Sequence, residues 1–351
     1  MTHAPRGKPA PVCQPGDFVF AAMALDHGHI YGQTNGLREA GGRCKWVYDP
    51  EPARVAAFIT AYPEAKAARA PAEILDDPAV HLVAAAAIPN LRADLGLQVM
   101  AAGKDYFTDK TPLTSLDQLA QVRTAVARTK RKYMVYFSER LHVESAMHAG
   151  DLVQQGAIGT VINVIGLGPH RLGSGRPAWF FDKQQYGGIL CDIGSHQIEQ
   201  FLFYSGATDA RIASAQVGNF ANPQTPELED FGEANLVGNT GATNYFRVDW
   251  FTPNGLRTWG DGRLFILGTD GYIELRKSID VATDNGGEQL LLVNGEKEQR
   301  IACQGQVGFP FFGRLIRDCL DRSETAMTQA HALKAAELCV KAQLAAVRVT
   351  G

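Results

Sequence analysis

The sequence predicts an α/β protein with two domains: a doubly wound parallel sheet, followed by an α/β domain with an open, predominantly antiparallel sheet. Three observations predict this fold class. The chain has 351 residues, about twice a common domain of roughly 150 residues. Short apolar runs alternate with helical patterns up to about residue 138. Beyond about residue 156, strand patterns in which apolar and polar residues alternate take their place.

The first domain alternates between strands and helices. The run 18–25 is almost entirely apolar, as expected of a strand that is covered on both faces. A helical stretch follows it and ends at Gly41 and Gly42. Further strands are predicted at 46–48, 80–88, 106–107 and 133–137, with helices at 52–62, 91–102 and 116–129. Parallel strands need crossover connections of this kind, so the pattern predicts a doubly wound sheet.

The second domain has the pattern of an open antiparallel sheet. Apolar and polar residues alternate over 245–250, the period of a strand with one exposed face. Similar runs, separated by Gly, Asn and Asp turns, occur at 161–167, 264–267, 272–275 and 289–293. An apolar stripe over 330–347 predicts a last helix that packs back on the first domain. We therefore place the domains at 18–138 and 139–351, after a flexible N-terminal lead over 1–17.

Charge and composition exclude several classes of protein. The chain has 34 Lys and Arg against 37 Asp and Glu, a net charge of −3, without the basic excess of a nucleic-acid binder. No apolar run reaches the roughly 18 residues of a transmembrane helix, so we expect neither a nucleic acid nor a membrane as partner. The six cysteines form no C-x-x-C pair, and the first residues lack an apolar signal segment. We expect a cytoplasmic protein with reduced thiols.

The loop after the first strand departs from the usual dinucleotide-binding pattern. A Rossmann domain commonly carries G-x-G-x-x-G there, whereas this chain has Ala24, Asp26 and His29 at the three glycine positions. Gly28 still permits a tight turn, and the imidazoles of His27 and His29 can face a phosphate. The alternative interpretation is that Asp26 caps the following helix and that both histidines are ordinary loop residues. This segment alone favours neither interpretation.

Asp49 bears on the choice of dinucleotide. It ends the second predicted strand, at close to the spacing of about 20 residues at which a carboxylate binds the ribose 2′-hydroxyl and repels a 2′-phosphate. We therefore expect NAD rather than NADP, although a helix cap is an alternative role for this residue. His27 and His29 also have H-x-H spacing. No Cys or carboxylate cluster completes a coordination shell in the sequence, so we expect no metal.

Two regions of the chain resemble a known family. Residues 87–92 (AIPNLR) and 102–112 (AGKDYFTDKTP) resemble the strand-four loop and the G-K-H-V…E-K-P signature of the Gfo/Idh/MocA oxidoreductases. That family is named for glucose-fructose oxidoreductase and inositol dehydrogenase. Residues 187–196 (GGILCDIGSH) resemble its G-G-G-x-x-x-D-x-G-x-H signature, and residues 267–271 resemble its Gly-Thr-x-Gly turn. The resemblance covers nearly the whole chain from Phe18, in the family's order.

The resemblance implies an NAD-dependent oxidoreductase that transfers a hydride between nicotinamide and a hydroxyl carbon of a sugar, glycoside or cyclitol. It implies that His196 acts as acid or base, that Asp192 positions it, and that Lys110 binds the same oxygen. The residues themselves fit these roles. Asp192 and His196 are four apart at a predicted helix start and share a face, where a carboxylate orients an imidazole. Lys110 follows a strand end, where open α/β sheets bind ligands. A helix histidine, a helix cap and a solvated cation are the structural alternatives.

Further contacts are expected at the same motifs. The expected cofactor contacts are Asp26, His27, Gly28, His29, Asp49, Pro89, Asn90, Arg92, Asp109 and Lys110. The expected substrate contacts are Lys110, Arg140, His170, Arg171, Trp179, Asp192 and His196, because Arg binds oxygens in a fork and Trp stacks on sugar rings. A surface loop with Trp179 half buried is the alternative. Asp109, Thr111 and Arg92 stand where the family commonly has Glu, Pro and His.

Two other functions remain open from the sequence. One is a glycoside lyase or hydrolase that uses NAD for a transient oxidation, elimination and re-reduction. The other is a non-catalytic family member with weakened cofactor binding, which the missing glycines favour and which the intact Lys110, Asp192 and His196 oppose. Phe246 or Trp250 would lie in water if the second sheet were uncovered, so we expect a homodimer or homotetramer that associates through that sheet.

Overall fold

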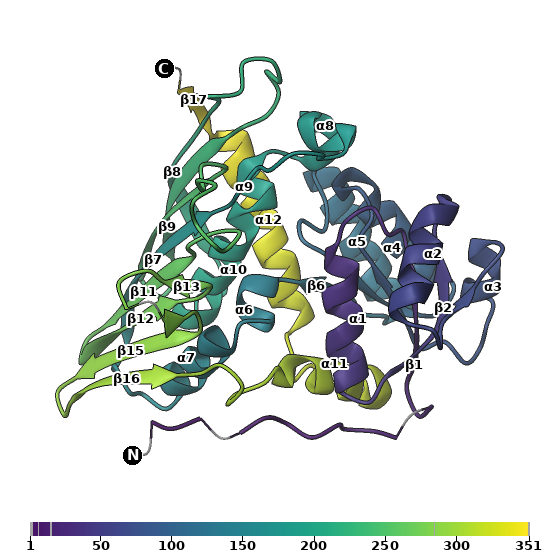
Figure 1. The fold of residues 1–351 in the computed structure, drawn as a ribbon, viewed down its shortest axis with the longest axis horizontal. Helices are drawn as coiled ribbons and strands as arrows, with labels where there is room; N and C mark the ends of the chain where they lie inside the picture. The colour runs from purple at the N-terminus through teal and green to yellow at the C-terminus, as the bar shows by residue number, and fades with distance from the viewer. Residues whose placement is uncertain (1–2, 6, 15, 284, 350–351) are drawn as a thin grey trace. The chain divides into compact units, whose positions relative to one another are not determined.

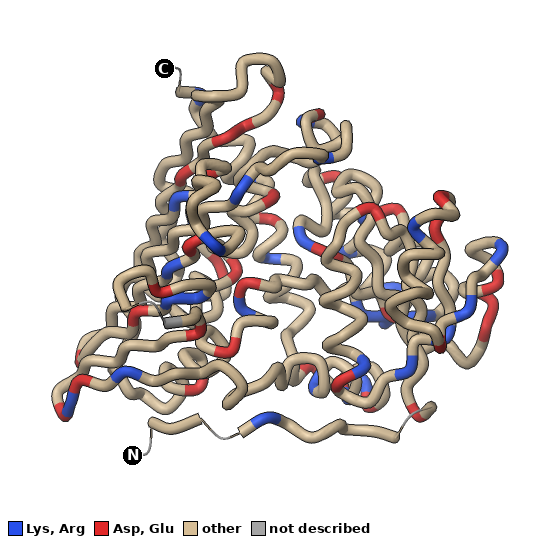
Figure 2. Tube along the Cα trace, viewed as in Figure 1, with Lys and Arg blue, Asp and Glu red and all other residues tan. Residues whose placement is uncertain are grey.

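The computed structural model describes residues 3–5, 7–14, 16–283 and 285–349, which fall into two units (Figure 1). The first, called here the parallel-sheet unit, comprises Pro9–Tyr136 and Phe309–Leu333. The second, called the mixed-sheet unit, comprises Phe137–Gly308, the described residues before Pro9 and those from Lys334 onward. Acidic and basic residues are mixed over both units (Figure 2). Within the described residues, no helix has the length and apolar character needed to cross a membrane.

The parallel-sheet unit confirms the predicted doubly wound fold. Its strands are β1 (Val19–Met23), β2 (Arg43–Tyr48), β3 (Lys66–Ala67), β4 (Leu82–Ala85), β5 (Asp105–Asp109) and β6 (Tyr133–Tyr136). They pair in parallel in the order β3-β2-β1-β4-β5-β6. Strands β1, β4, β5 and β6 are buried along their whole length, as the apolar runs of β1 and β4 predict. The strand order reverses beside β1, and ligands bind at the carboxyl ends of the strands at such a switch point.

Helices connect these strands and cover the sheet. They are α1 (His29–Glu39), α2 (Pro52–Ala61), α3 (Pro71–Leu75), α4 (Arg92–Ala101), α5 (Leu116–Thr129) and α11 (Pro310–Asp321), with a 3-10 turn η1 (Pro89–Leu91) before α4. Helix α11 comes from near the end of the chain. Its Phe311 and Phe312 are buried, with ring centroids 5.9 and 6.3 Å from that of Phe107 in β5. The unit therefore completes its core with residues about 200 positions after β5.

The mixed-sheet unit is built on nine strands. They are β7 (Val161–Pro169), β8 (Ala210–Gly218), β9 (Phe231–Gly238), β10 (Thr243–Asp249), β11 (Arg263–Gly268), β12 (Gly271–Arg276), β15 (Gln289–Asn294), β16 (Glu298–Ala302) and β17 (Val347–Val349). Their order is β16-β15-β12-β11-β7-β10-β9-β8-β17. Only the β10–β7 and β17–β8 pairs are parallel, so the sheet is mixed and mostly antiparallel. Strands β13 (Ile279–Asp280) and β14 (Asn285–Gly286) form a separate pair.

Helices cover one face of this sheet. They include α6 (Ser138–Leu141), α7 (Glu144–Gln154), α9 (Ile189–Asp192) and α10 (Gly194–Ser205) (Figure 1). A 3-10 turn η2 (Ala178–Phe181) and the short helix α8 (Lys183–Tyr186) come between β7 and α9. Phe246 and Trp250 are buried, and a Cβ at Gly194 in α10 would lie 3.3 Å from Phe246. The expectation that these aromatic residues need a second subunit to cover them is therefore wrong. The large apolar side chains that the sheet exposes include Ile162, Leu267 and Tyr272.

Segments near both ends of the given sequence are placed differently in the structure than the sequence predicts. Helix α12 (Gln329–Ala345) forms as predicted, but from Lys334 onward it belongs to the mixed-sheet unit. The segment that returns to the first unit is therefore 309–333, and the boundary between the units lies at 136/137 rather than 138/139. In the predicted flexible lead, the Val12 N–H donates to the Ala40 carbonyl at 2.9 Å, so this part is held. Residues 1, 2, 6 and 15 of that lead lie outside the described part of the chain.

Glu144, in the first turn of α7, binds the loop that leaves the mixed-sheet unit. Its Oε1 accepts a hydrogen bond from the Gly305 N–H at 2.9 Å, and its Oε2 accepts from Val307 at 2.7 Å and Gly308 at 3.0 Å. Burial alone would raise the pKa of the Glu144 carboxyl, but these three N–H groups outweigh burial and lower it. The ionised carboxylate therefore stabilises the folded state.

We expect Glu144→Gln to lower the free energy of unfolding by about 1.5–3 kcal/mol at pH 7, because hydrogen bonds to a charged group are lost. The folded pKa lies below the unfolded value of about 4.3, so this contribution is complete above that pH and is lost as the pH falls through the folded pKa. Urea unfolding of both proteins at pH 7 and pH 3.5 measures the difference. Equal stability at pH 7 would show that the three bonds contribute nothing.

Candidate active site

The loop after β1 keeps two features that a dinucleotide phosphate requires. Ala24, at the first glycine position, has φ +53°, the left-handed conformation that glycine adopts most easily. Gly28 is the N-cap of α1, which has no side-chain cap and no acidic residue in its first turn. A Cβ at Gly28 would meet nothing within 4 Å. Backbone N–H groups at a helix start bind anions, so the turn fits an anionic group although its glycines are replaced. Asp26 is not the cap of this helix.

The buried side chain of Asp49 accepts hydrogen bonds from the backbone of this loop and of the residues after β2. Its side chain is 0% exposed; Oδ2 accepts from the Leu25 N–H at 2.6 Å and Oδ1 from the Glu51 N–H at 2.8 Å. Arg54 binds Asp26 at 2.5 Å and reaches Asp49 at 3.4 Å. The cap of α2 is Glu51, so the alternative role of Asp49 as a cap is wrong. Two carboxylates share one guanidinium here, which leaves a local charge of −1.

Arg92 is a structural residue of the sheet edge. Its side chain is buried, and its Nε donates to the Ala87 carbonyl at 2.6 Å. One amino group donates to the Lys110 and Thr111 carbonyls, and the other binds Asp109 at 3.1 Å. Because these donors are bound inside the fold, Arg92 ties the β4 loop to the end of β5. Its expected role as a cofactor contact stays a prediction.

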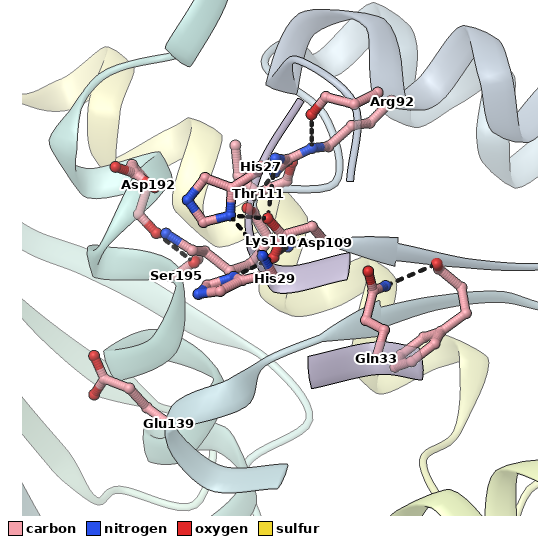
Figure 3. Close-up of polar contacts among 12 residues, drawn as sticks. His27, His29, Gln33, Arg92, Asp109, Lys110, Thr111, Glu139, Asp192 and Ser195 are labelled. Carbon is pink, nitrogen blue, oxygen red and sulfur yellow. Dashed lines mark hydrogen bonds and ion pairs between the residues drawn. The ribbon is translucent and has the colours of Figure 1, made fainter. Parts of the chain in front are cut away.

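Three side chains converge at the carboxyl ends of β1 and β5 (Figure 3). His27 Nδ1 lies 3.0 Å from Asp109 Oδ2, and His29 Nδ1 lies 2.8 Å from Asp109 Oδ1. Burial lowers the pKa of His27 to about 4. Burial alone would raise the pKa of the Asp109 carboxyl, but His29, Arg92 and His27 hold it well below its usual range. The cluster is therefore a buried carboxylate between two imidazoles.

Several other expected contacts lie at the same sheet edge. Lys110 directly follows β5, and its side chain is buried. Pro89 is buried in η1, and the Asn90 carbonyl accepts a hydrogen bond from Gln118 at 2.7 Å. The structure therefore brings Lys110, the β1 loop and the β4 loop together at the switch point of the parallel sheet.

Asp192 and His196 lie in the mixed-sheet unit. Asp192 ends α9, and His196 stands in the first turn of α10. Ile193 between the two helices has φ −77° and ψ −38°, a helical conformation, so the four-residue spacing keeps both side chains on one face. Both residues are buried, and Ser195 Oγ donates to the Asp192 carbonyl at 2.7 Å.

A buried carboxylate that the list of expected contacts omits belongs to the same unit. Glu139 lies in α6, three residues after the last residue of β6, and its Oε2 accepts from Lys277 at 3.0 Å and from Gln197 at 2.9 Å. Burial alone would raise the pKa of Glu139, but the charges of Lys277, His196 and His170 hold it well below its usual range. An ionised carboxylate therefore acts electrostatically on both histidines. Its position two residues after the predicted strand 133–137 was the only sequence signal for it.

Three of the expected substrate contacts are occupied inside the fold. Arg140 binds Glu199 through Nε at 2.8 Å and stacks 3.8 Å above the Phe203 ring. Arg171 donates to the Pro253 and Leu256 carbonyls at 2.9 and 2.5 Å. Trp179 is buried beside Phe180, with ring centroids 5.5 Å apart. These side chains have partners inside the unit, and their expected role as substrate contacts stays a prediction.

His170 packs against an aromatic residue, Trp259, that the sequence analysis does not include among the expected contacts. Trp259 packs on it with ring centroids 4.4 Å apart and is 48% exposed. His170 Nε2 lies 3.9 Å from Glu139 Oε1. Trp259 lies in the loop before β11, where a lone aromatic among turn residues was the only signal.

Comparison with known proteins identifies the family. Residues 25–137 match the model described as an oxidoreductase family with an NAD-binding Rossmann fold, and residues 147–274 match the GFO/IDH/MocA C-terminal domain. Together the two matches span more than half of the chain. The chain belongs to the GFO/IDH/MocA oxidoreductase family. This membership confirms the resemblance seen in the signatures at Lys110 and at Asp192 and His196.

Solved structures and curated proteins agree with membership of the GFO/IDH/MocA family. The chain is 49% identical to an Erwinia carotovora atroseptica protein described as an oxidoreductase, over 95% of this chain and 100% of that one, with a TM-score of 0.92. Levoglucosan dehydrogenase in complex with NADH and levoglucosan shares the fold at 15% identity, with a TM-score of 0.76 over 93% and 96% of the chains. The levoglucosan dehydrogenase of Pseudarthrobacter phenanthrenivorans is 28% identical over 39% of this chain and 36% of that protein. The chain spans 33–42% of the length of the curated relatives it matches.

Proposed function

We propose that this GFO/IDH/MocA protein is an NAD-dependent oxidoreductase that transfers a hydride between nicotinamide and a hydroxyl carbon of a sugar, glycoside or cyclitol. The observation that carries the proposal is that Lys110, Asp192 and His196 are all retained and buried, and that His196 shares its unit with the ionised Glu139. The relative that binds NADH and levoglucosan supports a sugar as the substrate class.

The chain's own residues supply the acid–base chemistry of this reaction. Nicotinamide, when bound, accepts or returns the hydride of the carbon. His196 takes the hydroxyl proton as the carbon is oxidised, and the carboxylate of Glu139 stabilises the imidazolium that forms. Asp192, on the same helix face, orients His196. The Lys110 ammonium stabilises the negative charge that develops on the substrate oxygen.

The loop after β1 would hold the dinucleotide, with Gly28 and the start of α1 against its phosphates. We propose NAD rather than NADP as the cofactor. Asp26 and Asp49 together outweigh the single charge of Arg54, and the remaining negative charge repels a 2′-phosphate. This argument depends on the net charge of Asp26, Asp49 and Arg54 together, because the Asp49 side chain itself is buried.

A panel of neutral pyranosides and inositols, incubated with the protein and NAD, tests the proposed reaction. We expect NADH to accumulate together with a ketone product of the same carbon skeleton, and NADH to bind more tightly than NADPH in a fluorescence titration. Conversion of a glycoside without net NADH would instead indicate transient oxidation followed by elimination. Absence of dinucleotide binding would leave only a non-catalytic role, and tighter binding of NADPH would contradict the charge argument.

Association of subunits through the second sheet stays a prediction. Its support is now the exposed face that carries Leu267 and Tyr272, which are paired across β11 and β12, with Ile162 exposed on β7. Apolar side chains gathered on an exposed sheet are typical of contact surfaces.

A further inference from the structure

Trp259 is an exposed aromatic residue that the proposed reaction does not use. It lies in the loop between β10 and β11 of the mixed-sheet unit and is 48% exposed. Tryptophan is strongly buried on average, and aromatic side chains on a protein surface are enriched where a partner binds. An exposed tryptophan that the fold holds in one place is therefore suited to contact a ligand.

The backbone around Trp259 is held against the end of β7. The Trp259 carbonyl accepts a hydrogen bond from the Arg171 N–H at 2.8 Å, and the Gly260 carbonyl accepts one from Thr258 Oγ1 at 2.8 Å. A Cβ at Gly260 would lie 2.1 Å from the Pro169 carbonyl oxygen, so any larger residue would push the loop away from β7. Because the loop is already ordered, a ligand that packs on Trp259 pays little entropy to order it.

The imidazole of His170 packs against Trp259 and is itself fixed. The centroids of the two rings lie 4.4 Å apart. His170 Nδ1 donates to the Gly168 carbonyl at 3.1 Å, since a carbonyl oxygen can only accept. The His170 ring also meets Trp250, with ring centroids 5.5 Å apart. Trp250 is buried whereas Trp259 is exposed, so Trp259 is the one of these two tryptophans that a ligand can reach.

These rings adjoin the carboxylate that serves the proposed acid–base residue. His170 Nε2 lies 3.9 Å from Glu139 Oε1. Glu139 Oε2 accepts a hydrogen bond at 2.9 Å from Gln197, which directly follows His196 in α10. All of these residues belong to the mixed-sheet unit. Contacts within one unit therefore link Trp259 to the start of α10, where His196 stands.

We propose that Trp259 binds the C–H face of a six-membered ring substrate, a pyranose or a cyclitol. The face of an aromatic ring is negatively polarised, whereas the oxygens of such a substrate polarise its C–H groups positively. A rigid ring presents several of these groups together on one face. An acyclic polyol has no such face and loses more conformational entropy when it binds. The inference rests on the proposed function for the kind of ligand, and it narrows that ligand to ring forms.

The test measures binding by calorimetry in the presence of NADH, so that no turnover is needed. The ligands are the methyl pyranosides of glucose, galactose, mannose and xylose, then myo-inositol, and sorbitol as the acyclic polyol. The variants are Trp259→Ala and Trp259→Phe. Trp46→Ala is the matched control, because Trp46 lies in β2 of the parallel-sheet unit, where its indole N–H donates to Asp77 at 2.7 Å.

The ring ligand that the wild type binds most tightly is expected to bind Trp259→Ala about 10-fold or more weakly, as when other tryptophans that pack on a partner are truncated. Trp259→Phe should stay within about 3-fold of the wild type, because it keeps an aromatic face. Trp46→Ala should match the wild type. On a ligand that is oxidised, Trp259→Ala should raise KM with kcat unchanged, the result expected when a contact is made equally in the ground state and the transition state.

Several results would overturn the proposal. They are equal affinity of the wild type and Trp259→Ala for every ring ligand, sorbitol binding as tight as that of the ring ligands, and binding of none of the ligands. A changed oligomeric state of Trp259→Ala with unchanged ring affinity would instead assign Trp259 to a subunit contact. A ring ligand that binds through Trp259 but is not oxidised would contradict the proposed reaction and support the role of Trp259. Circular dichroism checks the fold, and Trp259→Leu, which keeps apolar bulk without an aromatic face, replaces Trp259→Ala if that variant is unfolded.

Discussion

Replacing His196 with alanine is expected to lower kcat/KM by about 100- to 10,000-fold on any substrate that the wild type oxidises, because a positioned acid–base group contributes that much. Lys110→Ala is expected to lower kcat by about 100-fold or more, since it removes a cation from the oxygen on which charge develops. Both variants should still bind NADH. Steady-state kinetics and a dinucleotide titration measure the two effects separately.

The controls for this experiment are a histidine and a lysine outside the proposed site. His331→Ala and Lys341→Ala remove side chains of α12, where Lys341 pairs with Glu337. Their kinetics should match those of the wild type. Near-normal turnover in both His196→Ala and Lys110→Ala would refute the roles proposed for these residues, even if the protein proves to be an oxidoreductase.

The second large effect concerns folding. Arg140→Met is expected to lower the free energy of unfolding by about 3–5 kcal/mol, because it leaves the charge of Glu199 buried without its guanidinium. The two side chains are 3% and 0% exposed. Equilibrium unfolding in urea measures the loss. The double variant Arg140→Met/Glu199→Leu should recover much of it, since replacing a buried ion pair as a whole by apolar residues is often neutral.

An ion pair nearer the surface is the control for this experiment. Arg263 and Asp261 are 32% and 19% exposed, and Arg263→Met should cost no more than about 1 kcal/mol. If Arg140 served mainly as a substrate ligand, its variant would fold with nearly normal stability and show a raised KM. A loss below about 1 kcal/mol for Arg140→Met would therefore contradict the structural role.

Much of the fold could be predicted because the spacing of apolar residues distinguishes strands from helices, and turn residues mark where these elements end. The apolar runs at β1 and β4 mark strands that are buried on both faces, and the alternation in β10 marks a half-covered strand. Strand β8 was missed because polar and small residues weaken its alternation. Strand β16 was missed because it lies at the sheet edge, and edge strands commonly carry charged residues.

The candidate site was predictable only in part, because spacing places a residue at a strand end but does not say which atoms it binds. Asp49 stands where the spacing predicts, yet its oxygens accept N–H groups of its own unit. Arg92 lies in the segment 87–92 that resembles the family's strand-four loop, but its donors bind carbonyl groups and Asp109. The pairing of His29 with Asp109 joins positions 80 residues apart, which no local pattern shows.

The late return of the chain to the parallel-sheet unit affects how the protein folds during synthesis. Phe311 and Phe312 pack on Phe107, so this core lacks part of its apolar surface until the ribosome has reached residue 312. Contacts between positions so far apart slow folding and prolong the exposure of the unfinished core. The parallel-sheet unit is therefore not an independent N-terminal module, and a fragment that ends at residue 136 would expose the surface on which α11 packs.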